Sequence, residues 1–263
     1  MNPQENFEAK PAAGARPRYL IPEPTYDYNN PEVIYWTQRF RDLGQRRDVF
    51  VNIHATIKAR RSREAAEIMA RIWCDFSRHV PKFIARAVSY TDDPERQHHL
   101  IQIAYDELGG RNKKLIHSNL FLEALAKVGI HFTPGPNLTA IRPALDMLDE
   151  SLVGAGSEEA IIGLLLSFEI LAPENIETLF ECLCFDNASG ELLSASPFFK
   201  IHRQDETEHI RHSVANFLRF CTTEDDKEQF LKAFDDGLSF WERFWDQSSR
   251  LIIVATEPCA KAA

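Results

Sequence analysis

Apolar side chains recur along most of this chain at intervals of three and four residues, the spacing that places them on one face of an α-helix. Runs in which apolar and polar residues alternate, as in a half-buried strand, are absent from the sequence. Capping residues and glycines divide the pattern into segments. The predicted helices run from Pro31 to about Lys58, Ser62 to about Tyr90, Pro94 onward, about Asn112 to Val128, Ser157 onward, about Ser194 to Phe220 and Glu224 to about Ile253. We therefore expect an all-α fold, a single-domain bundle of about seven or eight helices.

The two ends of the chain lack this periodicity. Residues 1–30 are rich in proline, alanine, asparagine and tyrosine, which indicates an arm that either lies over the domain or is disordered. The helical domain is expected over residues 31–255, followed by a tail over residues 256–263. With 263 residues, 44% of them hydrophobic, the chain suits one sizeable core.

Composition narrows the class of function. A net charge of −9 and a pI near 5.5 give no basic footprint for nucleic acid or for an anionic membrane, so a small-molecule partner is expected. No stretch approaches the roughly 20 apolar residues of a membrane span. The five cysteines are odd in number and form no CxxC pair, which argues against a disulfide framework and a zinc ribbon. These features predict a cytoplasmic protein.

The densest group of metal-ligand residues lies in residues 198–212. At about 100° per residue, Glu206 lies about 40° to one side of His202 and His209 about 20° to the other, so the three share one helix face. Asp205 flanks the same stripe and is an alternative carboxylate. Mixed imidazole and carboxylate sites with open positions suit iron and dioxygen chemistry. The alternative interpretation is a solvated helix face that carries incidental histidines.

Glu169 is a carboxylate within an apolar helix. The flanking run, residues 161–171, is apolar nearly all round, which is typical of a buried helix. A buried glutamate costs several kcal/mol unless it is neutral, paired or metal-bound. The sequence therefore predicts a buried Glu169 with a partner, which is either a metal ion, an arginine or a helix terminus.

Glu107 and His117 form a third candidate group. They are too far apart to be neighbours on one straight helix, but Gly109 and Gly110 lie between them. A distorted Gly-Gly connection can direct both side chains toward one point. On spacing alone, a surface Asp-Glu pair and a histidine at the edge of the core is the simpler interpretation.

Three motifs occur in one order along the chain. They are Tyr-Asp-Glu-Leu-Gly-Gly followed by His117-Ser118-x-Leu-Phe, a glutamate in an apolar helix before Pro173-Glu174, and Phe-Phe-x-Ile-His-x3-carboxylate-x2-His. Together they resemble the haem-oxygenase-like diiron oxidases and oxygenases, a helical family that binds non-haem iron rather than haem. The resemblance covers roughly residues 35–250. It implies a haem-oxygenase-like fold and the metal ligands Glu107, His117, Glu169, His202, Glu206 and His209.

The resemblance also implies a chemistry. Two ferrous ions would activate dioxygen, the cosubstrate, to oxidise a small metabolite docked beside them. The expected substrate is an amino acid or amine of a biosynthetic pathway, which undergoes N-oxygenation or oxidative C–C or C–N cleavage. An external electron donor and a homodimeric state are compatible with this. The family usually has Asp at the position of Glu206, which keeps Asp205 open as the ligand. Asp205 and His212 are also candidates to orient the ligating imidazoles.

Two alternatives remain at this stage. A metal-independent relative on the same fold would be a cofactorless oxidase or a thiaminase-like hydrolase. The hydrolase needs a cysteine that faces the central pocket, and Cys74 or Cys221 would have to supply it. The second alternative is a non-catalytic helical interaction protein whose polar cluster is structural.

Overall fold

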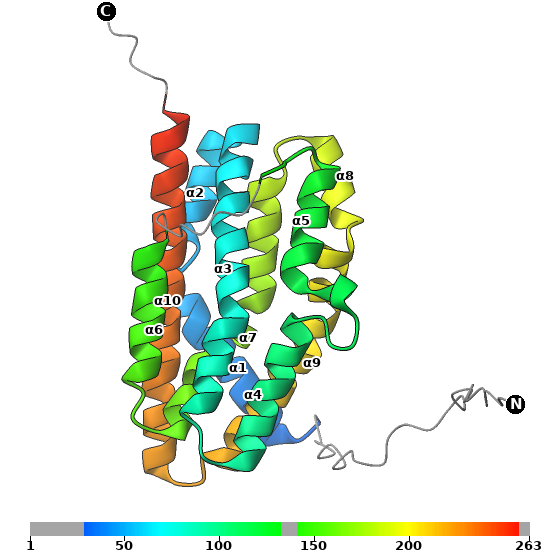
Figure 1. The fold of residues 1–263 in the computed structure, drawn as a ribbon. Coiled ribbons are helices and arrows are strands. Elements are labelled where there is room, and N and C mark those ends of the chain that lie inside the picture. Colours follow the sequence, from blue (N-terminus) through cyan, green and yellow to red (C-terminus); the bar gives the residue numbers. More distant parts are fainter. Residues whose placement is uncertain (1–28, 133–140, 258–263) are drawn as a thin grey trace, which may run out of the picture.

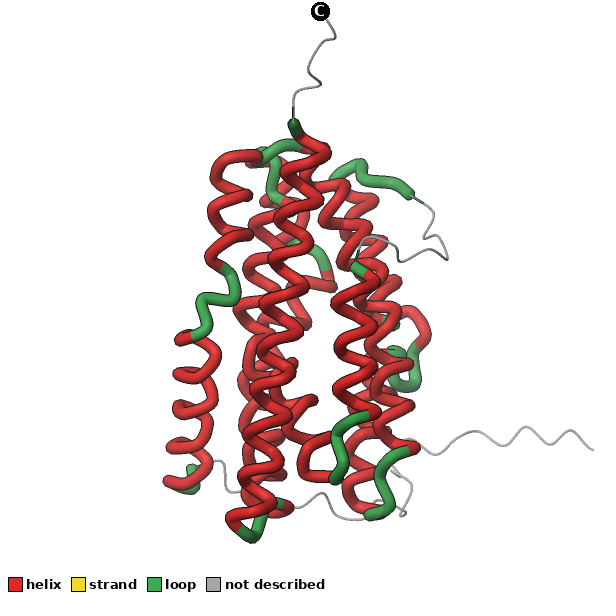
Figure 2. Tube along the Cα trace, turned by 90° about the vertical axis from the view of Figure 1, so that its left-hand side faces the viewer, coloured by secondary structure: helices red, strands yellow, loops and turns green. Residues whose placement is uncertain are grey.

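Helices account for all the regular secondary structure in the described part of the computed structural model, residues 29–132 and 141–257 (Figures 1 and 2). The side chains of residues 204–209 and 212 are also outside the description, although their backbone is helical. The all-α class predicted from the sequence is confirmed. The arm as far as residue 28 and the tail from residue 258 lie outside the described residues, so both stay predictions.

The described residues form ten α-helices and one short 3-10 helix, more than the seven or eight helices expected. Two of the additional helices are α6 and α8, and the third arises from a break in the first predicted helix. The helices are α1 (Pro31–Arg46), α2 (Val51–Arg60), α3 (Arg63–Ser89), α4 (Pro94–Glu107), η1 (Lys113–Leu115), α5 (His117–Lys127), α6 (Arg142–Val153), α7 (Glu158–Leu183), α8 (Asn187–Ser194), α9 (Pro197–Phe220) and α10 (Glu224–Thr256).

The helix predicted from Pro31 to Lys58 is wrong as a single element. It breaks between α1 and α2, where Asp48 adopts a left-handed backbone with φ 48°. The preceding residue, Arg47, forms ion pairs with Asp235 at 2.9 Å and with Glu242 at 3.2 Å, both on α10. Aspartate tolerates the left-handed region better than most residues. The break is therefore accompanied by contacts distant in sequence, which a local pattern does not reveal.

Capping residues set several helix starts where the sequence predicts them. The hydroxyl of Ser62 accepts a hydrogen bond from the Ala65 amide at the start of α3, and that of Ser157 accepts one from Ala160 at the start of α7. Asp93 caps α4, with Pro94 in its first turn. Each cap satisfies an amide that the helix itself leaves without an acceptor.

The core lies where α3, α7 and α10 pack together. Figure 1 shows α10 running nearly the full height of the bundle. From α3, Phe76 stacks on Phe168 of α7 with ring centroids 6.2 Å apart, and both rings contact Trp241 of α10 at 5.2 Å. Rings of this size bury large apolar areas. This aromatic core forms the scaffold beside which α4, α5 and α9 carry most of the candidate ligands.

Candidate metal centre

Glu107 and His117 lie side by side although ten positions of chain separate them. Glu107 is the last residue of α4 and His117 the first of α5. The Oε2 atom of Glu107 is 3.2 Å from Nδ1 of His117, and the two side chains are 25% and 19% exposed. A carboxylate and an imidazole at this distance and burial are suited to hold one cation between them or to orient each other.

The Gly-Gly turn makes this approach sterically feasible. Gly109 and Gly110 have φ values of 81° and 57°, in the region that favours glycine. A Cβ atom on Gly109 would lie 2.6 Å from the Asn112 carbonyl oxygen and 2.6 Å from the Ile116 amide nitrogen. Any larger residue at Gly109 would therefore push the chain away from Ile116, the residue directly before His117.

His202 joins this pair from α9. Its ring centroid is 4.8 Å from that of His117, and its Nδ1 atom lies 2.8 Å from the carbonyl oxygen of Phe198, one turn earlier. Since a carbonyl oxygen only accepts, Nδ1 carries the proton and donates it. In that tautomer Nε2 holds the lone pair with which a neutral imidazole binds a metal.

Glu169 is half-buried, so it is more exposed than the buried side chain that the sequence predicts. It lines a small cavity, of about 10 Å³, between α4, α7 and α9. The wall is mostly apolar, with Leu100 and Ile103 from α4 and Leu165 from α7. A carboxylate at the edge of such a wall has lost part of its water, which favours a bound cation beside it.

The other predicted ligands have side chains outside the described part of the structure. Glu206 and His209, together with Asp205 and His212, lie on the helical backbone of α9, and their roles stay predictions. Among the described side chains, no group of three or more His, Cys, Asp or Glu is close enough together to hold a metal ion. A complete ligand set would therefore depend on the side chains of α9 that are not described.

His99 is a candidate that the sequence analysis missed. It lies on α4 and lines the same small cavity as Glu169. The sequence signal for it is weak, because His98 and His99 stand together in a polar stretch and only His99 reaches this cavity. The other helices that line this cavity, α7 and α9, lie more than 50 residues away along the chain.

The residues present fit an iron site. His117 of α5 contacts Glu107 of α4 and His202 of α9, and Glu169 of α7 lines a cavity that α4 and α9 also line. Iron readily binds this mixture of oxygen and nitrogen donors. His202 has the tautomer that ligation requires. Each donor comes from a different helix, so the site depends on how these helices are placed relative to one another.

A larger cavity, of about 340 Å³, lies elsewhere on α7. The break between α1 and α2 lines it together with Ile170, Leu171 and Glu174. These three positions are about 100° to 200° around the helix from Glu169, so the cavity opens on a different face of α7. None of the candidate ligands whose side chains are described lines it.

Cys74 and Cys221 do not have the properties of a nucleophile. Cys74 and Cys221 are buried, and burial raises the pKa of Cys74 to about 11 and that of Cys221 to about 12. At neutral pH both are thiols, whereas the nucleophile in a cysteine hydrolase is the thiolate. Neither lines the cavity beside Glu169.

Comparison with known proteins gives a family whose description includes iron. Residues 75–242 match the model of a family described as iron-containing redox enzymes, a segment that contains all six predicted ligands. No curated protein matches the chain significantly. The described helices include none that is long and apolar enough to cross a membrane.

Solved structures show the same fold. A CADD-like protein of unknown function from Nostoc punctiforme aligns with a TM-score of 0.68 at 14% identity, over 84% of this chain and 99% of that one. A domain of unknown function with a heme oxygenase-like fold, from Shewanella denitrificans, aligns with a TM-score of 0.59 at 16% identity, over 88% of this chain and 98% of that one. The haem-oxygenase-like fold expected from the sequence is confirmed.

Proposed function

Because this chain belongs to the family of iron-containing redox enzymes, we propose that it is a non-haem diiron oxidase or oxygenase that uses dioxygen to oxidise a small metabolite. The observation that carries the proposal is that His117 contacts both Glu107 and His202. These residues come from three helices: Oε2 of Glu107 is 3.2 Å from Nδ1 of His117, and the centroids of the two imidazole rings are 4.8 Å apart. A structural ion pair has no use for the second histidine, whereas a metal site can use it as a further nitrogen donor.

The chain's own residues would bind and orient. Glu107 and Glu169 would supply negative charge that offsets a dication, and His117 and His202 would supply nitrogen donors. The Phe198 carbonyl holds the proton on Nδ1 of His202 and fixes the orientation of its ring. Leu100, Ile103 and Leu165 keep bulk water from the side of Glu169. Iron bound here would supply the electrons and the open coordination positions that dioxygen chemistry requires.

The proposed substrate is an amino acid or amine, oxidised at nitrogen or cleaved at a C–C or C–N bond in a biosynthetic pathway. This part of the proposal rests on the motif resemblance alone. We further propose that the enzyme works in the cytoplasm, with an external electron donor where the reaction consumes more electrons than the substrate provides. The acidic net charge of −9 supports a small-molecule partner over nucleic acid.

The thiaminase-like alternative has less support. It requires a cysteine thiolate in the central pocket, but burial keeps Cys74 and Cys221 protonated, with pKa values of about 11 and about 12. A non-catalytic protein would leave the tautomer and orientation of His202 without a purpose.

Anaerobic titration with ferrous iron tests the proposal. We expect saturation at two equivalents per chain, followed by a transient visible absorption band when dioxygen is admitted. A buffer-matched sample with zinc in both positions serves as the control, because zinc occupies such sites but has no redox chemistry. An absence of saturable iron uptake would contradict the proposal.

A further inference from the structure

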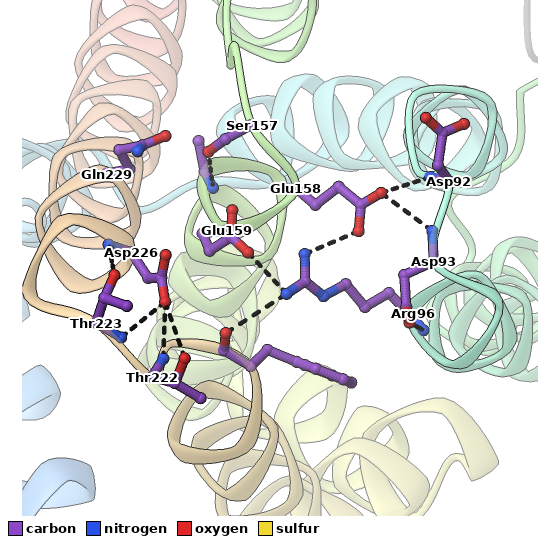
Figure 3. Close-up of polar contacts among 12 residues, drawn as sticks. Asp92, Asp93, Arg96, Ser157, Glu158, Glu159, Thr222, Thr223, Asp226 and Gln229 are labelled. Carbon is purple, nitrogen blue, oxygen red and sulfur yellow. Dashed lines mark hydrogen bonds and ion pairs between the residues drawn. The ribbon is translucent and has the colours of Figure 1, made fainter.

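An ion-pair cluster centred on Arg96 lies among α4, α7 and α9 at a distance from the candidate ligands (Figure 3). The guanidinium Nη1 of Arg96 is 2.8 Å from Oε2 of Glu158, and Nη2 is 2.7 Å from Oε1 of Glu159. The three side chains are only 14%, 20% and 16% exposed. Charges this far from solvent interact more strongly than a surface pair, and the loss of one partner is strongly destabilising.

The cluster joins the ends of three helices. Nη2 of Arg96 also donates to the carbonyl oxygen of Phe220, the last residue of α9, at 3.4 Å, and the guanidinium lies 4.9 Å from the centre of its ring. The second oxygen of Glu158 accepts hydrogen bonds from the amides of Asp92 and Asp93, at 2.6 Å and 3.0 Å, directly before α4. Figure 3 shows these contacts converging on Arg96 and Glu158 from separate helices.

The electrostatics favour a permanent charge on Arg96. Burial opposes the charged form, but the hydrogen bonds to Glu159 and Glu158 and their negative charges outweigh it and raise the pKa of Arg96 above its ordinary value. Arg219 of α9 adds an ion pair to Glu95 of α4 at the surface, between the same two helices. An exposed pair of this kind contributes little, so the buried Arg96 contacts dominate.

The spacing from this cluster to the candidate ligands is the same on two helices. Arg96 precedes Glu107 by eleven residues on α4, and Glu158 precedes Glu169 by eleven residues on α7. Eleven residues make about three turns, so each cluster residue lies on nearly the same helix face as its ligand, about 16 Å away along the axis. On α9, Phe220 follows position 209 by the same number of residues.

Helix α4 packs mainly against α3, and little of its surface is fully buried. Leu100 is its one fully buried residue, although the helix is 14 residues long. At its far end, α4 runs into the Gly109-Gly110 turn, whose close backbone contacts place Glu107 beside His117 of α5 rather than against α7. The Arg96 cluster links α4 directly to α7 through ion pairs, and it thereby bears on where Glu107 stands relative to α7.

We infer that Arg96 is a positioning residue for the metal site: its ion pairs fix the axial register of α4 against α7 and α9, and thereby the separation of the carboxylates of Glu107 and Glu169. This inference rests on the function proposed above. A slip of one residue would move a helix by about 1.5 Å and turn it by about 100°. Metal–ligand distances tolerate only about 0.2 Å, so much smaller shifts would weaken binding.

The test compares Arg96→Met with Arg47→Met. Arg47 also pairs with two carboxylates, Asp235 and Glu242, but it joins the α1–α2 link to α10, elements without a candidate ligand. For each variant the melting temperature without metal, the affinity for ferrous iron under anaerobic conditions and the visible spectrum of the Co²⁺-loaded protein are measured. The cobalt spectrum reports ligand geometry and would not respond to a general loss of stability.

We expect both variants to melt earlier, but only Arg96→Met to bind iron about tenfold more weakly or worse and to change the cobalt spectrum. Arg96→Lys keeps the charge but not the two-pronged pairing, so it should fall between Arg96→Met and the unmodified protein. If Arg96→Met does not fold, Arg96→Lys and Glu159→Gln carry the same comparison with Arg47→Met.

A folded Arg96 variant with unchanged iron affinity and an unchanged cobalt spectrum would overturn the inference, as would an equal loss of affinity in Arg47→Met. The failure of the proposed function itself gives a different result. In that case the unmodified protein takes up neither iron nor cobalt, and the positioning role falls with it.

Discussion

Helices α10 and α4 are held in place by different interactions. α10 spans 33 residues and buries a row of aromatic side chains, including Phe240, Trp241 and Phe244, against α3 and α7. α4 spans 14 residues, buries only Leu100 fully, and is fixed by the ion pairs of Arg96 and by a Gly-Gly turn. Because Glu107 ends α4, a candidate ligand lies on a helix with only one fully buried residue. The scaffold is therefore apolar, whereas the site depends on polar contacts and backbone geometry.

The largest effect on stability should come from the scaffold. Phe244 is fully buried and contacts the rings of Phe76 and Trp245 at 5.2 Å and 5.1 Å. Phe244→Ala should lower the free energy of unfolding by about 3–5 kcal/mol, because it removes a buried ring and leaves a cavity. Urea denaturation measures this. At a temperature where the variant remains folded, iron stoichiometry should be unchanged.

Phe185→Ala is the matched control, since this ring is only partly buried. Phe185→Ala should lower the free energy of unfolding by less than half as much as Phe244→Ala does. A loss of less than about 1 kcal/mol in Phe244→Ala would mean that the aromatic core is not what holds α10.

The second prediction concerns the backbone geometry at Gly109 rather than side-chain packing. Gly109→Ala should lower the free energy of unfolding by about 2–3 kcal/mol, because its φ of 81° is unfavourable for alanine and its Cβ would meet backbone atoms at 2.6 Å. Since the strain moves His117 away from Glu107, iron affinity should fall as well. Titration with ferrous iron and urea denaturation of the same samples measure both.

Gly110→Ala is the control for that turn. Its φ is 57°, but the nearest atom to an added Cβ is a ring carbon of Tyr105 at 3.5 Å. Gly110→Ala should lower the free energy of unfolding by only about 1 kcal/mol, and the variant should keep most of its iron affinity. Equal iron binding in the two alanine variants would show that the turn does not place His117.

The third prediction is a substitution of His202, which should change stability little but metal binding strongly. His202→Ala should cost about 1 kcal/mol, the worth of its hydrogen bond to the Phe198 carbonyl, yet abolish tight binding of at least one iron ion. His54→Ala is the control, because that imidazole also makes one hydrogen bond, to Thr178, and stacks on Phe50, but lies on α2. Unchanged iron stoichiometry in His202→Ala would remove His202 from the site.

The smallest effect concerns the thiols. Burial raises the pKa of Cys74 and of Cys184 from 9.0 to about 11, and that of Cys221 to about 12. A rise of two units leaves about 100-fold less thiolate near neutral pH, so iodoacetamide should alkylate these cysteines at least that much more slowly in the folded protein than in urea. Mass spectrometry of a Cys259→Ser variant measures this without the fifth cysteine. Fast alkylation of Cys74 or Cys221 would restore the hydrolase alternative.

Local signals in the sequence predict much of this molecule. The all-α class follows from apolar spacing, and the caps Ser62, Asp93 and Ser157 mark helix starts that the structure has. The Gly-Gly break between Glu107 and His117 was also readable, because only glycine accommodates such a turn readily.

Features that depend on distant contacts were not predictable. The break between α1 and α2 accompanies ion pairs from Arg47 to a helix nearly 190 residues away. Arg96 and its partner Glu158 are 62 residues apart, and neither belongs to a motif. His99 becomes a candidate only because α4 packs beside Glu169. In each case the local sequence looks like ordinary helix surface.

The central claim is that helices held by apolar packing and helices held by ion pairs and turn geometry bring their side chains to one iron site. Anomalous X-ray scattering at the iron edge, from crystals loaded with ferrous iron without oxygen, tests it most directly. The account predicts two peaks within ligand distance of Glu107, His117, Glu169 and His202, with the side chains of α9 completing the set. Iron peaks elsewhere on the protein, or peaks that none of these four residues contacts, would contradict it.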